Sequence, residues 1–230
     1  MAASSGPDEQ NNGDSMAPLQ ALRRFTRGRQ PARSSAEHCE LCSMGIPAEH
    51  FHLLDLSNRT VLCACHACSI LFNGEGAGGG KYRRVPRRYL SLLDFQMSDE
   101  QWDELMIPVN MVYIFRNSLA KRVTAFYPSP AGAMESLLSL NSWEMLVNNN
   151  PLLHELEPDV EALLINRVRE KREYYIVPID ACYLLVGLIR LHWRGLSGGE
   201  EVWQEITKFF ANVQAKSQPM RGVTDARPEL

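Results

Sequence analysis

The residues of this sequence that are best suited to chemistry are its cysteines. Five of the six lie between residues 39 and 68, and four of these form two C-x2-C pairs, Cys39 with Cys42 and Cys65 with Cys68, which 22 residues separate. A C-x2-C pair lets a tight backbone loop direct two thiolates at one ion, and two such loops complete a tetrahedral four-thiolate site. We therefore predict that these four cysteines are the ligands of a single metal ion.

The ion expected at this site is zinc, with iron as the alternative, because a tetrahedron of four thiolates does not by itself choose between the two. Haem attachment is excluded, since Ser43 and Ser69 stand where a C-x-x-C-H motif needs a histidine. The chain also has no C-x2-C-x2-C run of the kind that binds a ferredoxin cluster.

The two remaining cysteines lie outside these pairs. In an extended segment Cys63 and Cys65 point to the same face, so Cys63 could replace a ligand or bind an ion transiently. Its alternative role is that of a small buried apolar residue. Cys182 has no histidine near it in the sequence and lies at the start of an apolar helical segment, so we predict that it only packs.

Two short strands and a helix are expected to position the four cysteines. Residues 51–56 and 60–63 are strand-like, and the turn-like tripeptide 57–59 joins them. Residues 66–72 suit a short helix whose first turn carries Cys68. A loop, a hairpin and a second loop at the start of a helix make up a treble clef, which is closely related to the zinc ribbon.

The fold class expected for the chain is α+β, with this small module followed by an α+β domain that has an antiparallel sheet and C-terminal helices. Composition divides the sequence into five predicted parts: a disordered N-terminal tail (1–35), the four-cysteine metal-binding module (36–75), a glycine-rich loop with a basic edge (76–90), the α+β domain (91–213) and a disordered C-terminal tail (214–230). Strands of the larger domain are predicted at 109–115, 122–127 and 173–179, and residues 160–167 could form a strand or a helix, with the strand favoured.

Helix signals are also present in this domain. Ser98 precedes an acidic first turn, which is typical of a helix N-cap. We expect Asp180 to cap a helix over residues 183–193 that is buried on nearly every side, with Gly187 at a close backbone contact. Ser197 is expected to begin a last helix, after which the chain is polar beyond Val213.

Composition and charge limit the cellular compartments and the classes of partner that we expect for this protein. The net charge of −3 gives no whole-chain field toward nucleic acid or a membrane surface. The first residues show no apolar secretory segment, and the longest apolar run, 181–189, is about half of what a membrane span needs. We therefore expect a cytoplasmic protein without a membrane span, where clustered thiols favour metal over disulfides.

Two segments between the predicted domains carry possible signals for phosphate binding. Gly74, Gly76 and Gly79 match the spelling of a nucleotide-binding motif, but the strand before it and the helix after it are missing, so we predict a flexible loop. The stretch 81–88 has five positive charges in eight residues. It could bind phosphates or an acidic partner, or it could be a solvated strand edge.

An enzymatic alternative rests on histidine. His50 and His52 between the two cysteine pairs are similar to the arrangement in zinc-bound HNH nucleases, in which a histidine on the first strand of the hairpin is the general base. His52 would be that base, and the stretch 81–88 would hold DNA, although Phe51 splits the adjacent histidine pair usual in those enzymes.

Four acidic residues form a further group in the sequence, and they are expected to be solvated. They are Glu135, Glu157, Asp159 and Glu161.

Taken together, seven stretches between Cys39 and Val213 resemble a family of uncharacterised bacterial proteins, a domain of unknown function common in actinobacteria. The stretches are 39–42, 52–55, 62–65, 126–133, 156–164, 185–190 and 193–203. Proteins of this family are often encoded beside nickel–iron hydrogenase genes. The resemblance implies a non-enzymatic accessory role, in which a hydrogenase subunit or maturation factor is the partner, and it supplies no catalytic residues.

Overall fold

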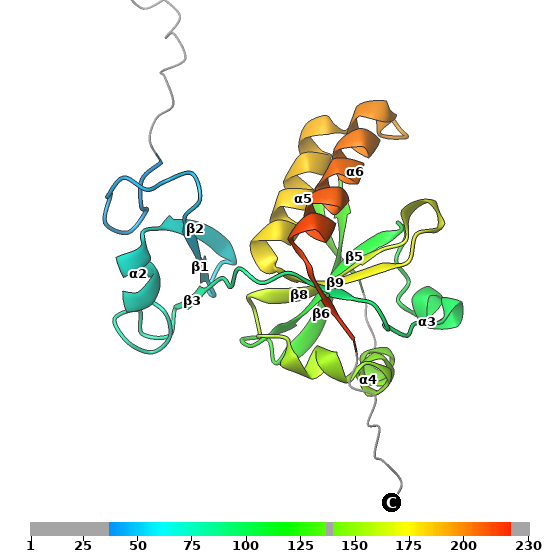
Figure 1. The fold of residues 1–230 in the computed structure, drawn as a ribbon, viewed down its shortest axis with the longest axis horizontal. Coiled ribbons are helices and arrows are strands. Elements are labelled where there is room, and N and C mark those ends of the chain that lie inside the picture. The colour runs from blue at the N-terminus through cyan, green and yellow to red at the C-terminus, as the bar shows by residue number, and fades with distance from the viewer. Residues whose placement is uncertain (1–36, 137–139, 222–230) are drawn as a thin grey trace, which may run out of the picture. The chain divides into compact units, whose positions relative to one another are not determined.

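The computed structural model describes residues 37–136 and 140–221 (Figure 1). The predicted N-terminal tail and the last nine residues lie outside these ranges. The α+β fold class is confirmed, because the described chain combines helices with two largely antiparallel sheets. None of the helices in the described ranges is both long and apolar enough to cross a membrane.

A three-stranded sheet carries the cysteine-rich part of the chain. Its strands have the spatial order β2-β1-β3. The short helix α2 lies between β2 and β3 in the sequence. The predicted hairpin and helix are confirmed almost residue for residue; the elements are β1 (Phe51–Asp55), β2 (Thr60–Ala64), α2 (His66–Leu71) and β3 (Tyr82–Arg84). The basic stretch thus begins with a strand that pairs antiparallel to β1.

A seven-stranded sheet forms the larger part, with the order β10-β4-β9-β8-β5-β6-β7. All its neighbours pair antiparallel except β10 and β4, which are parallel. The strands are β4 (Leu90–Leu92), β5 (Met111–Asn117), β6 (Arg122–Ser129), β7 (Gly132–Ser136), β8 (Glu161–Asn166), β9 (Glu173–Pro178) and β10 (Gln218–Met220). The four strands predicted in the larger domain correspond to β5, β6, β8 and β9.

Both faces of this sheet are buried, which explains why its central strands are apolar at nearly every position. Met111, Tyr113 and Phe115 of β5 pack into one core with α5 (Ile179–His192) and α6 (Gly199–Lys216). Val112 and Ile114 of the same strand point to the opposite core, as the two-residue period of a strand requires.

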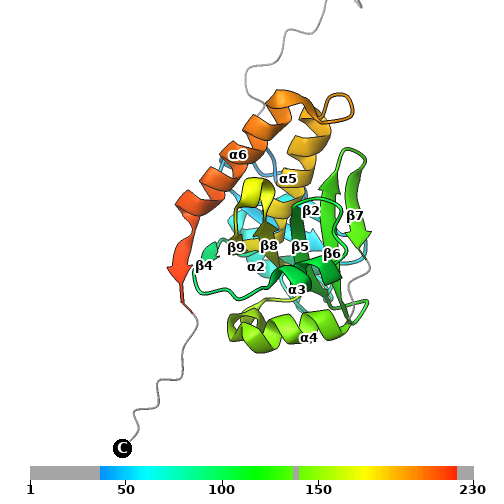
Figure 2. The same cartoon turned by 90° about the vertical axis from the view of Figure 1, so that its right-hand side faces the viewer.

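The second core is covered by shorter helical elements. They are α3 (Asp99–Glu104), α4 (Leu140–Asn149) and the 3-10 helix η1 (Pro151–Glu155), and a further 3-10 turn, η2 (Val168–Glu170), joins β8 to β9. Figures 1 and 2 show α5 and α6 on one side of the sheet and α4 on the other. Ser98 is the N-cap of α3, and Gln101 completes a capping box with it, as its position in the sequence predicted.

Several expectations for the C-terminal half are wrong. Asp180 lies in the first turn of α5 rather than at its cap, which is Pro178, and Leu184 and Leu191 leave one side of this helix exposed. A Cβ on Gly187 would meet no described neighbour outside its own helix within 4 Å, so this glycine marks no close contact. The last helix starts at Gly199 rather than at Ser197.

The chain also remains ordered beyond Val213, where a tail was predicted. Helix α6 continues to Lys216, and Gln218 begins β10, which adds to the edge of the sheet beside β4. No pattern in the sequence indicated β10, because a three-residue edge strand containing a proline has neither apolar alternation nor length. Such a strand forms only when it can pair with the exposed edge of another strand.

The described residues 37–136 and 140–221 belong to one compact unit, in which the two sheets share a core. Leu54 and Leu56 from the hairpin and Val85 after β3 are buried in the same core as α5 and α6. Polar contacts add to this junction. Arg88 binds both carboxylate oxygens of Glu161, at 2.6 and 2.8 Å, and Arg59 and Arg83 contact Asp159 at 3.2 and 3.4 Å.

The four acidic residues that were expected to be solvated differ in their burial. Glu135 and Glu157 are exposed as predicted, whereas Asp159 and Glu161 are fully buried and the expectation that they are solvated is wrong. The basic stretch 81–88 supplies much of the compensating charge, since Lys81 also contacts Asp55 at 3.1 Å. Most of its cations thus stabilise the fold internally instead of forming a free phosphate-binding edge.

The contacts between the two sheets predict that substitutions of Arg84 and Arg88 destabilise the fold by unequal amounts. Arg88→Ala leaves the buried Glu161 carboxylate without its cation, with the Glu157 amide still donating to it, and should lower the free energy of unfolding by about 3–5 kcal/mol. Arg84→Ala is the matched control, because the Arg84 guanidinium lies over the Phe51 ring and its loss should cost about 1 kcal/mol or less. Urea unfolding measures both, and equal losses would contradict the anchoring role of Arg88.

Candidate metal centre

The first cysteine pair lies in a tight loop before β1. The Cys39 amide donates to the Met44 carbonyl at 2.8 Å, and the Ser43 amide donates to the Cys39 carbonyl at 2.8 Å. Ser43 has a φ of 60°, the left-handed conformation that closes the turn. A bridge between His38 and Gly45 closes the base of the loop. This geometry directs the side chains of both cysteines to one side.

The second pair lies where β2 passes into α2. Cys65 is the N-cap of α2, and its sulfur accepts a hydrogen bond from the Cys68 amide at 3.4 Å. A thiolate suits this position, because the first amides of a helix have no partner within the helix. The Glu40 amide donates to the Cys63 carbonyl at 2.9 Å, which holds the first loop against β2.

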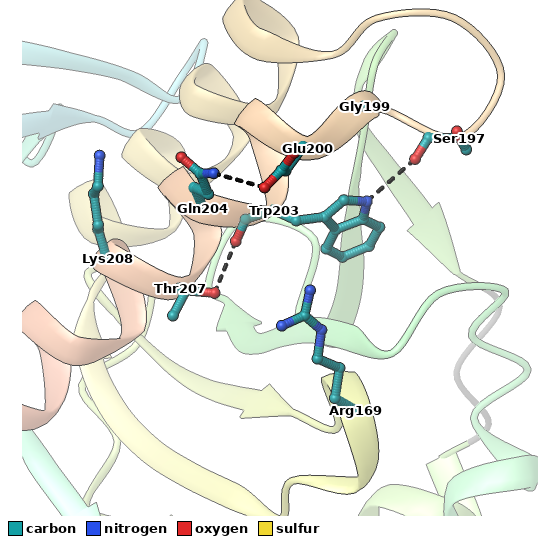
Figure 3. A pocket seen from close by; sticks show the side chains of 8 residues that line it. All are labelled: Arg169, Ser197, Gly199, Glu200, Trp203, Gln204, Thr207 and Lys208. Atoms are coloured by element: carbon teal, nitrogen blue, oxygen red, sulfur yellow. Dashed lines mark hydrogen bonds between the residues drawn. The ribbon is translucent and has the colours of Figure 1, made fainter.

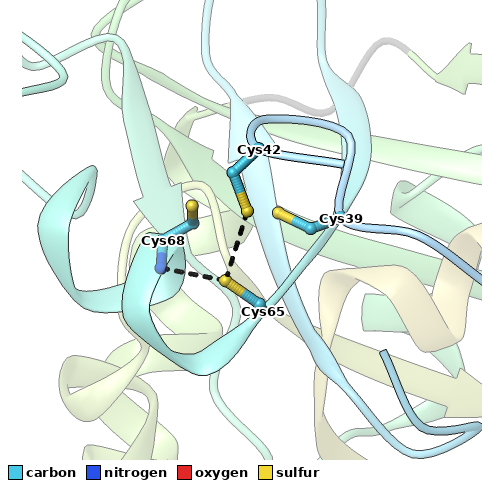
Figure 4. A group of neighbouring side chains, drawn as sticks. All are labelled: Cys39, Cys42, Cys65 and Cys68. Carbon is cyan, nitrogen blue, oxygen red and sulfur yellow. Dashed lines mark hydrogen bonds between the residues drawn. The ribbon is translucent and has the colours of Figure 1, made fainter. Parts of the chain in front are cut away.

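The structure brings all four predicted cysteines together (Figure 4). Their sulfur atoms lie within 4.8 Å of one another, and Cys42 and Cys65 are separated by 3.7 Å between sulfurs. A zinc ion with four bonds of about 2.3 Å to thiolates requires sulfur separations of about 3.8 Å. The cluster could therefore hold one tetrahedral ion with small adjustments of the side chains.

The environments of the four thiols differ. Cys39, Cys65 and Cys68 are buried, whereas Cys42 is exposed. Burial opposes ionisation of Cys39, but hydrogen bonds from the backbone at Cys65, Leu41 and Cys42 outweigh it and lower its pKa to about 6. Burial raises the pKa of Cys68, and its contacts with the neighbouring thiols raise it further. A positive ion would favour the thiolate form of all four.

The apolar core beside this cluster is small. Its buried members are Cys39, Ile46, Leu53, Ala64, Cys65 and Cys68. Half of these residues are the candidate ligands themselves, so little apolar area remains to stabilise the loops around them. A bound ion would supply this stability, as it does in other small cysteine-rich modules.

Neither Cys63 nor Cys182 is one of the four clustered cysteines. Cys182 lies in the first turn of α5 and is fully buried, as predicted for a packing residue, and burial raises its pKa. Cys63 is half-buried, and burial followed by the charges of Glu40 and Glu37 raises its pKa. It lies beside His50 and His52, whose candidate ligand atoms are within 4.8 Å of its sulfur and of each other.

His52, the candidate general base, has a partner that the sequence did not indicate. Its Nδ1 donates to the Asp180 carboxylate at 2.6 Å, across 128 residues of sequence. Asp180 was assigned to helix capping because local patterns report only neighbours along the chain. No signal in a single sequence could have shown that the first turn of α5 meets the face of β1.

A cavity of about 810 Å³ lies elsewhere, along α6 (Figure 3). Its described lining contains one carboxylate, Glu200, which accepts a hydrogen bond from Gln204 at 3.1 Å. Trp203 forms part of the wall, and its indole nitrogen donates to the Ser197 carbonyl at 3.2 Å. Neither histidine nor cysteine is among these lining residues, so the cavity offers a surface for contact rather than a nucleophile with its base.

Comparison with known proteins gives a family without an assigned activity. No match to the chain was found among curated proteins or among solved structures. The model of one family, described as a family of unknown function (DUF5947), matches residues 38–217 and so covers all the described helices and every described strand except β10. The chain therefore belongs to this family of unknown function, DUF5947.

Proposed function

We propose that this protein is a non-enzymatic zinc-binding accessory protein of the cytoplasm, which aids the assembly or maturation of a nickel–iron hydrogenase through protein–protein contacts. The observation that carries the first part is the convergence of four sulfur atoms within 4.8 Å. Four protein thiolates leave no coordination position for a substrate, which is typical of structural rather than catalytic zinc. Zinc is preferred to iron because it needs no redox partner and suits four-thiolate loops of this kind.

The surface proposed for partner contact is the connection between α5 and α6. Leu196 at its tip is fully exposed, and Leu191 is 64 % exposed. Trp193 and Trp203 pack against each other at the base of this connection, with ring centroids 6.4 Å apart. Aromatic residues beside exposed leucines are typical of protein-binding surfaces. The same segment, 193–203, is one of the stretches that carry the resemblance to hydrogenase-associated proteins.

A nuclease of HNH type is the alternative, with His52 as its general base. The bond from His52 Nδ1 to Asp180 supports it, because a carboxylate orients a histidine in this way when the other ring nitrogen accepts a proton. The proposed DNA-binding stretch gives it less support. Lys81, Arg83 and Arg88 are engaged with Asp55, Asp159 and Glu161, so their charges are largely compensated.

The metal assignment predicts one zinc ion per chain that withstands dialysis against a weak chelator. Cys65→Ser should lose this ion, as measured by mass spectrometry of the metal content. Cys182→Ala is the control, because Cys182 packs in the other core and its loss should leave the zinc unchanged. Iron in place of zinc in protein from the native host, or the same zinc content in both variants, would contradict the assignment.

Loss of the ion should also have a local effect on stability. Structural zinc in small modules contributes on the order of 10 kcal/mol. In Cys65→Ser, hydrogen exchange should therefore accelerate in the loops around Cys39 and Cys68, while the amides of β5 and β8 stay protected by their own core. Equal acceleration in both sheets would show that they unfold as one unit.

The partner assignment predicts that a hydrogenase subunit, identified by mass, co-purifies with the full-length chain from its native host at low salt. Leu196→Glu should reduce the recovery about tenfold, because it places a charge at the centre of the proposed contact. Leu119→Glu is the control, since Leu119 is also exposed but lies in the turn between β5 and β6. Unchanged recovery with Leu196→Glu would place the contact elsewhere.

DNA binding and cleavage assays distinguish the alternative. A nuclease should bind DNA with an affinity that falls steeply as salt rises, and cleavage should be lost in His52→Ala. The accessory role predicts no cleavage by the wild-type protein with added divalent ions. Cleavage that disappears in His52→Ala would establish the nuclease in its place.

A further inference from the structure

We propose that His50, His52 and Cys63 form a second metal site, separate from the four-cysteine cluster, which binds an exchangeable divalent ion of the zinc type. The β1–β2 hairpin presents all three side chains on one face. His50 and His52 are two residues apart along an extended segment, and Cys63 is the residue directly opposite His52 on β2. One candidate ligand atom from each residue lies within 4.8 Å of the other two.

The tautomer of His50 makes it suited to hold an ion. Its Nδ1 is 2.9 Å from the Pro47 carbonyl, which can only accept a hydrogen bond, so Nδ1 carries a proton. In the neutral ring the lone pair is then on Nε2. The His50 side chain is only 8 % exposed, and Nε2 is buried without a hydrogen-bond partner among the described residues. A buried acceptor of this kind calls for a missing partner, which a metal ion provides.

Asp180 prepares the second histidine in the manner of known metal sites. It accepts the Nδ1 hydrogen of His52 at 2.6 Å, which leaves the Nε2 lone pair of His52 for an ion. Histidine ligands of metals usually donate their other ring nitrogen to a carboxylate, because this fixes the ring and makes the ligand more basic. The other Asp180 oxygen is buried and has no described partner, so the carboxylate has no competing hydrogen bond.

The surroundings favour an ion that can enter and leave. His50, His52 and Asp180 border a cavity of about 400 Å³ that Arg87 and Lys216 also line, and these two positive charges weaken the hold on a cation and so favour its release. Two imidazoles and a thiolate suit zinc and similar first-row divalent ions. Three protein ligands leave a fourth position for water or for a group of another molecule, in contrast to four closed thiolates. The two groups of ligands share no residue.

The number of zinc ions bound by the full-length protein tests this site. The wild-type chain, saturated with Zn²⁺ and analysed by equilibrium dialysis and mass spectrometry, should bind two ions. His50→Gln and Cys63→Ser should each bind one, and a weak chelator should remove the second ion from the wild type but leave the first. His66→Gln is the control, because His66 is an exposed histidine on α2 outside both groups and should leave two ions bound.

Substitution of Co²⁺ identifies the ligands directly. The second equivalent of Co²⁺ should add a thiolate-to-cobalt absorption band that is absent in Cys63→Ser. In Asp180→Asn the second ion should bind about 10–100-fold more weakly, since the carboxylate only orients His52. Circular dichroism and the retained first ion show whether each variant is folded. If His50→Gln does not fold, the conservative variant Cys63→Ser decides the outcome.

One ion in the saturated wild type, or two ions in both His50→Gln and Cys63→Ser, would overturn the second site. Failure of the four-thiolate assignment looks different, because Cys65→Ser would then still bind as many ions as the wild type.

Discussion

Two fully buried carboxylates, Asp159 and Glu161, determine how the cysteine-bearing hairpin meets the larger sheet. A buried charge is tolerated only when it is paired, and here three arginines from the hairpin turn, β3 and the segment after β3 supply the pairs. Because the carboxylates lie at the start of β8 in the centre of the sheet, these pairs fix the position of β1. His52 and Asp180 meet as a result of that placement.

The β1–β2 hairpin lies between two different groups of side chains that could bind a metal ion. The loop before it and the helix after it bring together four sulfur atoms, a set that could enclose one ion and would then stabilise a module with little apolar core. The face with His50, His52 and Cys63 offers only three donors and borders a cavity. Ligand number would thus distinguish a structural ion from an exchangeable one within one short segment.

Much of the local structure could be predicted because its causes are local. The cysteine spacing, the turn at residues 57–59 and the cap at Ser98 each act over a few residues, and the structure has the elements they predict. The strands β5 and β8 were recognisable from continuous apolar runs, which are typical of strands buried on both faces. Errors fell on Gly187, on the start of α5 and on β10, whose conformations depend on distant neighbours.

The sequence by itself determined which four cysteines could converge, since two C-x2-C loops around a hairpin leave the chain few other ways to place them. Only the tertiary structure decided that Asp159 and Glu161 are buried anchors, that most of the basic stretch is internally paired, and that Asp180 contacts His52. The contacts of Asp159 with Arg59, of Glu161 with Arg88 and of Asp180 with His52 join residues 100, 73 and 128 positions apart. A charge pattern along one chain does not specify such pairs, because any of several cations could satisfy a given carboxylate until the packing of the two sheets selects one.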